Sequence, residues 1–233
     1  MSSHAPSLAV AVSADGERNR LVRRARTLSW LSVGWMTVEA VAAIVAAVVA
    51  GSVALLGFGL DSLIELVSAS VVIWRFTGTR GQSEAAERRA QQLIAACFGA
   101  LSLYLVVDGI RGLVTGAHSH ASWPGAAVAL GAIVVMPLLA RAKGRVATRL
   151  GSAATAGDAA QSWLCAIAAA GVPLSILANA AIGWWWLDPV IGLAIAGLAV
   201  HAGREAWAGK TCGDCAPVGF ESRMSCRGSV TDV

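Results

Sequence analysis

Charged residues are scarce in this sequence. Asp, Glu, Lys and Arg make up 14% of its 233 residues, whereas 56% are hydrophobic. Soluble domains usually contain about 25% charged residues, because a surface in contact with water needs them. The composition therefore argues against a water-soluble domain and indicates a membrane protein.

Cysteine is also infrequent, and two of the five cysteines, Cys97 and Cys165, lie inside apolar segments. This usage does not predict a disulfide framework. The sequence likewise lacks a basic stripe for nucleic acid, because its basic residues fall between apolar segments. A signal-peptide cleavage site is missing too, and a polar start with five arginines predicts an uncleaved first span.

Six apolar segments are present instead, each close to the ~20 residues that cross a bilayer as a helix. They fall at about 28–50, 53–76, 91–114, 123–140, 158–183 and 188–203. The 25 glycines and the long Ala and Val runs are typical of helices that pack closely in lipid. We therefore predict an all-α membrane protein with a six-transmembrane helix bundle rather than a barrel.

The basic residues predict the orientation of this bundle. With both termini in the cytoplasm, all of the 18 Lys and Arg residues except Arg111 lie on the cytoplasmic side, as the positive-inside rule expects. We divide the chain into a basic cytoplasmic segment (1–27), a six-span transmembrane domain (28–207) and a short cysteine-containing cytoplasmic tail (208–233).

Two carboxylates lie inside the second apolar segment. Asp61 and Glu65 are four residues apart, so both lie on one face of a helix. An ionised carboxylate at membrane depth costs about 2.5 to 3.5 kcal/mol, and two neighbouring ones also repel. A bound cation would compensate both costs. The alternative is that one or both are protonated and hydrogen-bonded to other helices.

The fifth apolar segment offers matching groups. Asp158, Gln161 and Cys165 are spaced to lie on one helical face. Antiparallel packing of the two segments would place Cys165 near Asp61, and Gln161 or Asp158 near Glu65. A thiolate combined with carboxylates favours Zn²⁺ over Mg²⁺ or Ca²⁺. For Cys165 the alternative is an inert buried thiol.

Two further acids lie within apolar segments. Glu39 is in the middle of the first segment, without a basic residue nearby in sequence, and either lines a permeation path or supplies a ligand. Asp108 lies three residues before Arg111, and we expect an ion pair between them.

Segment 52–65, SVALLGFGLDSLIE, resembles the second-span signature of the cation diffusion facilitator transporters. Segment 157–165, GDAAQSWLC, resembles their fifth-span motif, with Gln161 and Cys165 at positions where the family usually has histidine and aspartate. Glu65 likewise stands where the family has aspartate. The chain thus looks like a divergent, compact member without the family's C-terminal cytoplasmic domain.

The resemblance implies a homodimeric exporter in the plasma or inner membrane, and not an enzyme. Such a transporter moves Zn²⁺ or a related divalent metal cation out of the cytoplasm against protons. The metal is its substrate, and no prosthetic group is implied. The metal ligands implied here are Asp61, Glu65, Asp158, Gln161 and Cys165.

Two other functions fit parts of the sequence. Cys212 and Cys215 form a CxxC pair, with Cys226 further on, which is typical of metal handling or of a membrane thiol-disulfide oxidoreductase. Alternatively, the bundle is a membrane metal sensor that binds the ion without transporting it.

Overall fold

The computed structural model describes residues 5–50, 53–116 and 123–209, and in this part of the chain all regular structure is helical. A short 3-10 helix, η1 (Gly78–Gln82), separates the second and third α-helices. The six α-helices of the described residues are α1 (Ala5–Ala50), α2 (Val53–Arg75), α3 (Glu84–Thr115), α4 (Trp123–Leu150), α5 (Ala153–Ile182) and α6 (Leu187–Trp207).

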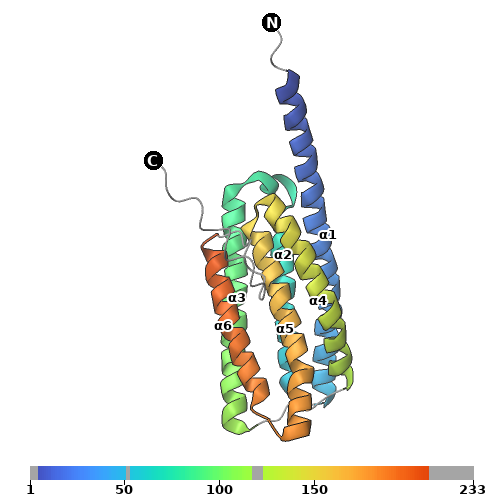
Figure 1. Ribbon diagram of the computed structural model, residues 1–233, viewed down its shortest axis with the longest axis vertical. Helices are drawn as coiled ribbons and strands as arrows, with labels where there is room; N and C mark the ends of the chain where they lie inside the picture. Colours follow the sequence, from blue (N-terminus) through green and yellow to red (C-terminus); the bar gives the residue numbers. More distant parts are fainter. Residues whose placement is uncertain (1–4, 51–52, 117–122, 210–233) are drawn as a thin grey trace.

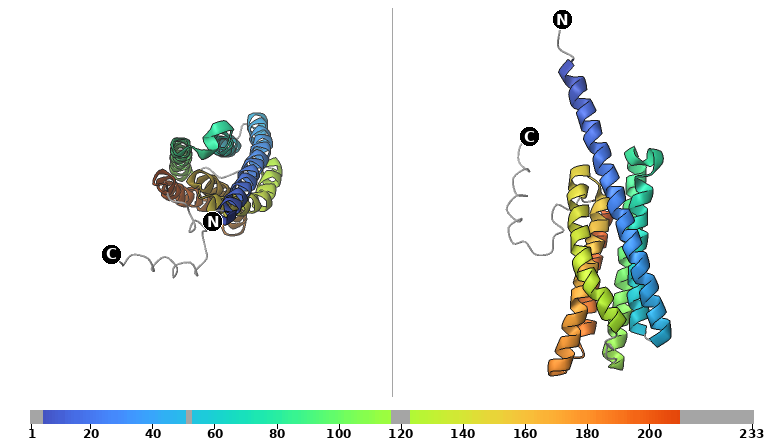
Figure 2. Two further views of the ribbon diagram at one scale, coloured as in Figure 1. Left: turned by 90° about the horizontal axis from the view of Figure 1, so that it is seen from above. Right: turned by 90° about the vertical axis from the view of Figure 1, so that its right-hand side faces the viewer.

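The six helices form an elongated bundle in which successive helices run in opposite directions (Figure 1). Helix α1 extends beyond the other helices at the end of the bundle where α6 finishes (Figure 2). The start of α1 and the end of α6 therefore lie at the same end, as an even number of crossings requires. We call this the terminal end of the bundle.

Much of the outer surface of the bundle is apolar. Large side chains such as Leu103, Val114 and Leu177 are 67%, 80% and 66% exposed, which is typical of helices that face lipid. Among the described residues, four helical segments are long and apolar enough to cross a membrane: Gly16–Val45, Glu84–Thr115, Ala153–Asn179 and Leu187–Trp207. The protein is therefore an integral membrane protein with an all-α fold.

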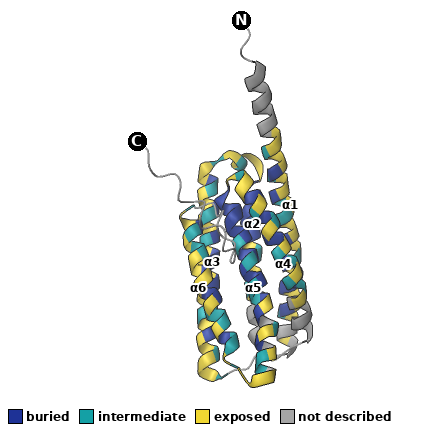
Figure 3. Cartoon of the chain, in the orientation of Figure 1, coloured by how far each residue is buried: buried dark blue, intermediate teal, exposed yellow. Residues whose placement is uncertain are grey.

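Helix α5 lies at the centre of the bundle. It packs against α2, α3, α4 and α6, and its buried residues are concentrated in its first half (Figure 3). Small residues such as Ala154, Gly157 and Ala169 line it, so the neighbouring helices approach closely. A methyl group at Gly157, for example, would lie 2.8 Å from the side chain of Ile94.

Several helices are longer than the apolar segments predicted. Helix α1 begins at Ala5 instead of about 28, α3 begins at Glu84 instead of about 91, and α4 continues to Leu150 instead of about 140. The apolar segments mark only the part of a helix that suits lipid, whereas polar residues continue the helix beyond it. At the start of α3, the Ser83 hydroxyl caps the helix by accepting a hydrogen bond from the Ala86 amide.

The start of α5 is buried on all sides, from Ser152 to Ala159, so the free amides of its first turn need partners. The Glu87 carboxylate of α3 accepts hydrogen bonds from the Ala154 amide and the Ser152 hydroxyl, each at 2.9 Å. Its other oxygen lies 2.6 Å from Arg75 Nε. Arg75, which lies inside the predicted apolar segment 53–76, is thus the buried last residue of α2. Glu87 of α3 therefore links α2 and α5 through its two carboxylate oxygens.

Replacing Glu87 by Gln is expected to destabilise the protein by about 3 kcal/mol, because Arg75 loses its charge partner while it stays buried. Glu84→Gln is the matched control, since Glu84 lies in the same first turn but is exposed. It should cost less than about 0.5 kcal/mol. Denaturant unfolding in detergent measures both, and equal losses would contradict this role of Glu87.

Candidate metal site

The predicted face-to-face arrangement of α2 and α5 is present. Glu65 is 1% exposed, accepts a hydrogen bond of 2.8 Å from the Ser162 hydroxyl, and is hydrogen-bonded to the Cys165 thiol. One turn further along α2, the Ser68 hydroxyl lies 3.4 Å from Asp158 Oδ1. The two helices are antiparallel, as expected.

The register between these helices differs from the prediction by about one helical turn. Cys165 lies at the level of Glu65 rather than of Asp61, and Asp158 lies at the level of Ser68 rather than of Glu65. The prediction used only the spacing of polar residues, and it therefore placed the acids of α2 opposite the candidate ligands of α5. Packing instead aligns the Ser162 and Ser68 hydroxyls with the acids, because each buried carboxylate then gains a donor.

Asp158 forms a buried ion pair that the sequence did not suggest. Its Oδ2 lies 2.9 Å from Lys143 Nζ of α4, with side chains 0% and 1% exposed. Lys143 Nζ also donates a hydrogen bond of 3.0 Å to the Ser162 hydroxyl. A continuous polar chain therefore runs from Asp158 through Lys143 and Ser162 to Glu65. The sequence predicted Lys143 to follow the fourth apolar segment (123–140), outside the bundle. That position was wrong, because Lys143 is a buried residue of α4.

Glu39 of α1 joins the same region from the other side of α2. It is 2% exposed, and it accepts hydrogen bonds from Trp35 Nε1 at 2.6 Å and from the Ser62 hydroxyl at 3.0 Å. Asp61, partly exposed, lies within electrostatic range of both Glu39 and Glu65. Three acids on two adjacent helices thus share one part of the bundle.

Two acceptor oxygens in this region lack a partner. Glu65 Oε2 and Gln161 Oε1 are buried without a hydrogen bond among the described residues. Both belong to the facing sides of α2 and α5, since Gln161 lies one turn from Cys165 and next to Ser162. Buried acceptors without a donor are costly, so a cation or protons at this position would stabilise the arrangement.

The predicted ligands do not form one coordination shell in this structure. Within the part of the chain that the structure describes, no three His, Cys, Asp or Glu side chains are close enough to hold a metal ion together. Glu65 and Cys165 are in contact, but Asp158 is held by Lys143. A metal ion bound to all of the predicted ligands would require movement of side chains or helices.

Comparison with known protein families identifies the family of the chain. The family model for the cation efflux transmembrane domain matches residues 29–208, which is most of the chain. The chain belongs to the cation diffusion facilitator family. Members transport metal cations, so the polar region between α2 and α5 lies inside a metal cation transporter. No individually curated protein matches the chain significantly.

In this transporter Lys143 is the residue of the polar region that sequence reasoning missed. A signal for it was present, because the buried positions of α4 include Met136, Leu139, Ala140 and Ala147. Lys143 falls on the same helical stripe, three or four residues from its neighbours. A basic residue on an otherwise apolar stripe indicates a buried partner, here Asp158.

Other predicted groups contribute less to the region. Asp108 and Arg111 are both exposed and, within the described part of α3, do not form the expected ion pair. Cys97 is a buried free thiol near Phe98 and Leu101. The cysteine pair Cys212 and Cys215 lies outside the described residues, as does Cys226.

Proposed function

We propose that the chain exports a divalent transition-metal ion, with zinc as the first candidate, in exchange for protons, through a site between α2 and α5. The observation that carries this proposal is the pair of unpartnered buried oxygens, Glu65 Oε2 and Gln161 Oε1, beside the thiol of Cys165. They offer a cation several donors within one helix turn.

The donor set favours a borderline metal ion. The proposed ligands combine carboxylates, one amide oxygen and one sulfur: Asp61, Glu65, Asp158, Gln161 and Cys165. Zn²⁺ accepts such a mixture with four ligands, whereas Mg²⁺ and Ca²⁺ prefer shells made only of oxygen. The weak amide ligand suits a transporter, because the ion must also leave.

Lys143 balances the charge of the empty site in this mechanism. Its ammonium group pairs with Asp158 at 2.9 Å and reaches Glu65 through Ser162. An arriving metal cation competes with this ammonium for Asp158. Loading then releases Lys143 from the pair, and release of the ion allows the pair to form again.

Charge compensation also motivates the proton exchange. When a divalent cation leaves, the buried Glu39 and Glu65 and the half-buried Asp61 remain close together. Neighbouring negative charges favour the uptake of protons by the carboxylates, and metal binding displaces these protons again. Alternating access of the site to the two membrane faces would couple the two movements.

Flux measurements with the purified protein in vesicles test this function. We expect uptake of Zn²⁺ to exceed uptake of Mg²⁺ and Ca²⁺ clearly, and to accelerate when the vesicle lumen is more acidic than the medium, because protons then leave as zinc enters. Metal binding without flux would instead identify a sensor. Homodimer formation stays a prediction of the family resemblance, which crosslinking in the membrane can examine.

A further inference from the structure

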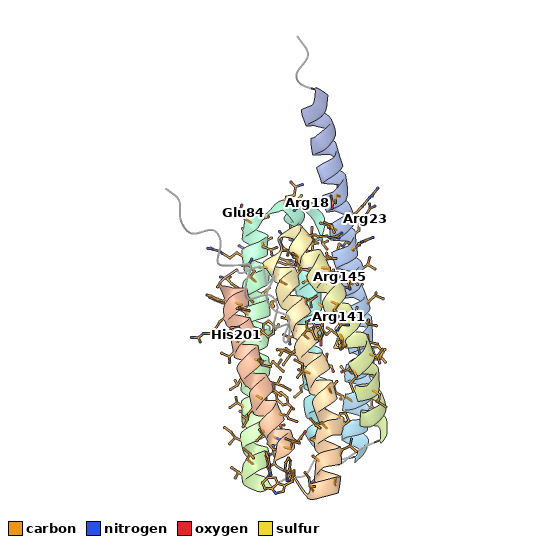
Figure 4. The ribbon with its side chains drawn as sticks, in the orientation of Figure 1. Arg18, Arg23, Glu84, Arg141, Arg145 and His201 are labelled. Carbon is orange, nitrogen blue, oxygen red and sulfur yellow. The ribbon has the colours of Figure 1, made fainter. Side chains whose placement is uncertain are left out.

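Two adjoining cavities lie between α1 and the last part of α4, at the terminal end of the bundle. One has a volume of about 780 Å³ and the other of about 490 Å³. Both are lined by Arg23, Arg24 and Arg149, so they form one groove. Arg20 and Arg145 complete its basic lining. We call it the arginine groove, and Figure 4 shows Arg23 on α1 and Arg145 on α4.

The arginines converge because of helical spacing. Arg20 and Arg24 are four residues apart on α1, as are Arg145 and Arg149 on α4, and each side chain is exposed. Like charges at this spacing destabilise a helix. Glu17 is the single acid among the lining residues, and in the described part of the chain none of the five arginines forms an ion pair. The groove therefore holds surplus positive charge.

Guanidinium groups bind phosphate well, because their forked donors match two oxygens at once. The positive-inside rule places arginines near one membrane face but does not require them to share a groove. Five guanidinium groups from two helices surround enough space for a phosphate headgroup. The chemistry of the groove thus fits a phosphate or phosphodiester anion.

The surface next to the groove distinguishes a lipid from a free anion. Thr27 and Ala142 line the groove, and one turn further from the terminal end, on the same helix faces, follow Leu31 and Leu138. These two leucines are 57% and 61% exposed. Acyl chains would contact this apolar surface, while the headgroup occupies the groove. A free phosphate would leave it uncovered.

We propose that the arginine groove binds the phosphodiester headgroup of an anionic phospholipid, whose acyl chains lie along α1 and α4. Helices α1 and α4 are in contact, and α4 carries Lys143 on its inner side. A lipid in the groove therefore bridges two helices, one of which reaches the polar region of the transporter. This binding is independent of which metal the protein carries.

Native mass spectrometry of the full chain in detergent tests the proposal, with phosphatidylglycerol and phosphatidylcholine as probes. We expect phosphatidylglycerol to be retained preferentially. The triple variant R23Q, R145Q and R149Q should bind it about 100-fold more weakly, from about 1 kcal/mol per arginine. The control variant R88Q, R89Q and R204Q removes three exposed arginines elsewhere at the terminal end and should retain the lipid.

Three results would overturn the proposal: equal retention of the two lipids, equal losses in the two triple variants, or displacement of the lipid by inorganic phosphate at equal concentration. The last would identify a site for free anions. A further variant, R23K, R145K and R149K, keeps the positive charge, so that loss of the lipid site can be distinguished from loss of the fold. It should bind with intermediate strength, because the forked donors are lost.

Discussion

The Lys143→Met variant is expected to be less stable than the wild type without metal and to respond more strongly to zinc. Removing the ammonium leaves Asp158 buried without its charge partner, which typically costs about 3 to 5 kcal/mol. The same change removes the cation that competes with the metal. Close charge pairs contribute about 1.5 kcal/mol or more, so zinc affinity should rise at least about tenfold.

Thermal unfolding in detergent, with and without Zn²⁺, measures both effects, because a ligand stabilises the folded state according to its affinity. The double variant Lys143→Met with Asp158→Asn serves as control. It should recover most of the lost stability, since the unpaired charge is gone, but it should not show the enhanced zinc response. An unchanged zinc response in Lys143→Met would show that this lysine does not compete with the metal.

Glu65→Gln is expected to reduce zinc uptake into vesicles at least about 100-fold. Glu65 contacts both Ser162 and Cys165 of α5 and supplies one of the two unpartnered oxygens. The amide keeps the shape of the side chain but removes the charge that would bind a cation. Residues that merely support a metal ligand already contribute 10- to 100-fold, roughly, to affinity or activity.

The same Glu→Gln change at Glu84 is the control for transport, because Glu84 is exposed at the start of α3. Its uptake should match the wild type. Thermal unfolding of both variants separates loss of function from loss of fold. Normal uptake by a well-folded Glu65→Gln protein would remove Glu65 from the path of the ion.

Much of the fold could be predicted from the sequence, because lipid imposes a simple rule. A spanning helix needs an apolar stretch of defined length, and the predicted segment 53–76 agrees with α2 (Val53–Arg75) to within one residue. The rule is silent about helix beyond the lipid. It therefore missed the first turns of α1 and the last ten residues or so of α4, where polar residues continue the helix.

The candidate site was predictable in part. The spacing of Asp61 and Glu65 and of Asp158 and Cys165 identified the two helix faces that meet. It did not determine their register, which depends on the hydroxyls of Ser68 and Ser162 and on close packing. Such contacts involve residues far apart in sequence, and no local pattern specifies them.

Lys143 illustrates a second limit. Counting basic residues assigned it to a loop, because the rule treats every lysine near an apolar segment as a signal of orientation. Its position on the buried stripe of α4 was the better guide. Arg75 shows the same effect at the end of α2, where Glu87 pairs with it. Lys143 and Arg75 were counted as signals of orientation, but each also neutralises a carboxylate inside the bundle.

The most direct test of the account is X-ray absorption spectroscopy of the zinc-loaded protein, with Cys97, Cys212, Cys215 and Cys226 replaced by Ser so that Cys165 is the single sulfur donor from cysteine. We predict one sulfur neighbour at about 2.3 Å together with oxygen neighbours at about 2.0 to 2.2 Å. The sulfur signal should vanish when Cys165 is also replaced by Ser. Bound zinc with only oxygen or nitrogen neighbours before that last replacement would contradict a site between α2 and α5 that includes Cys165.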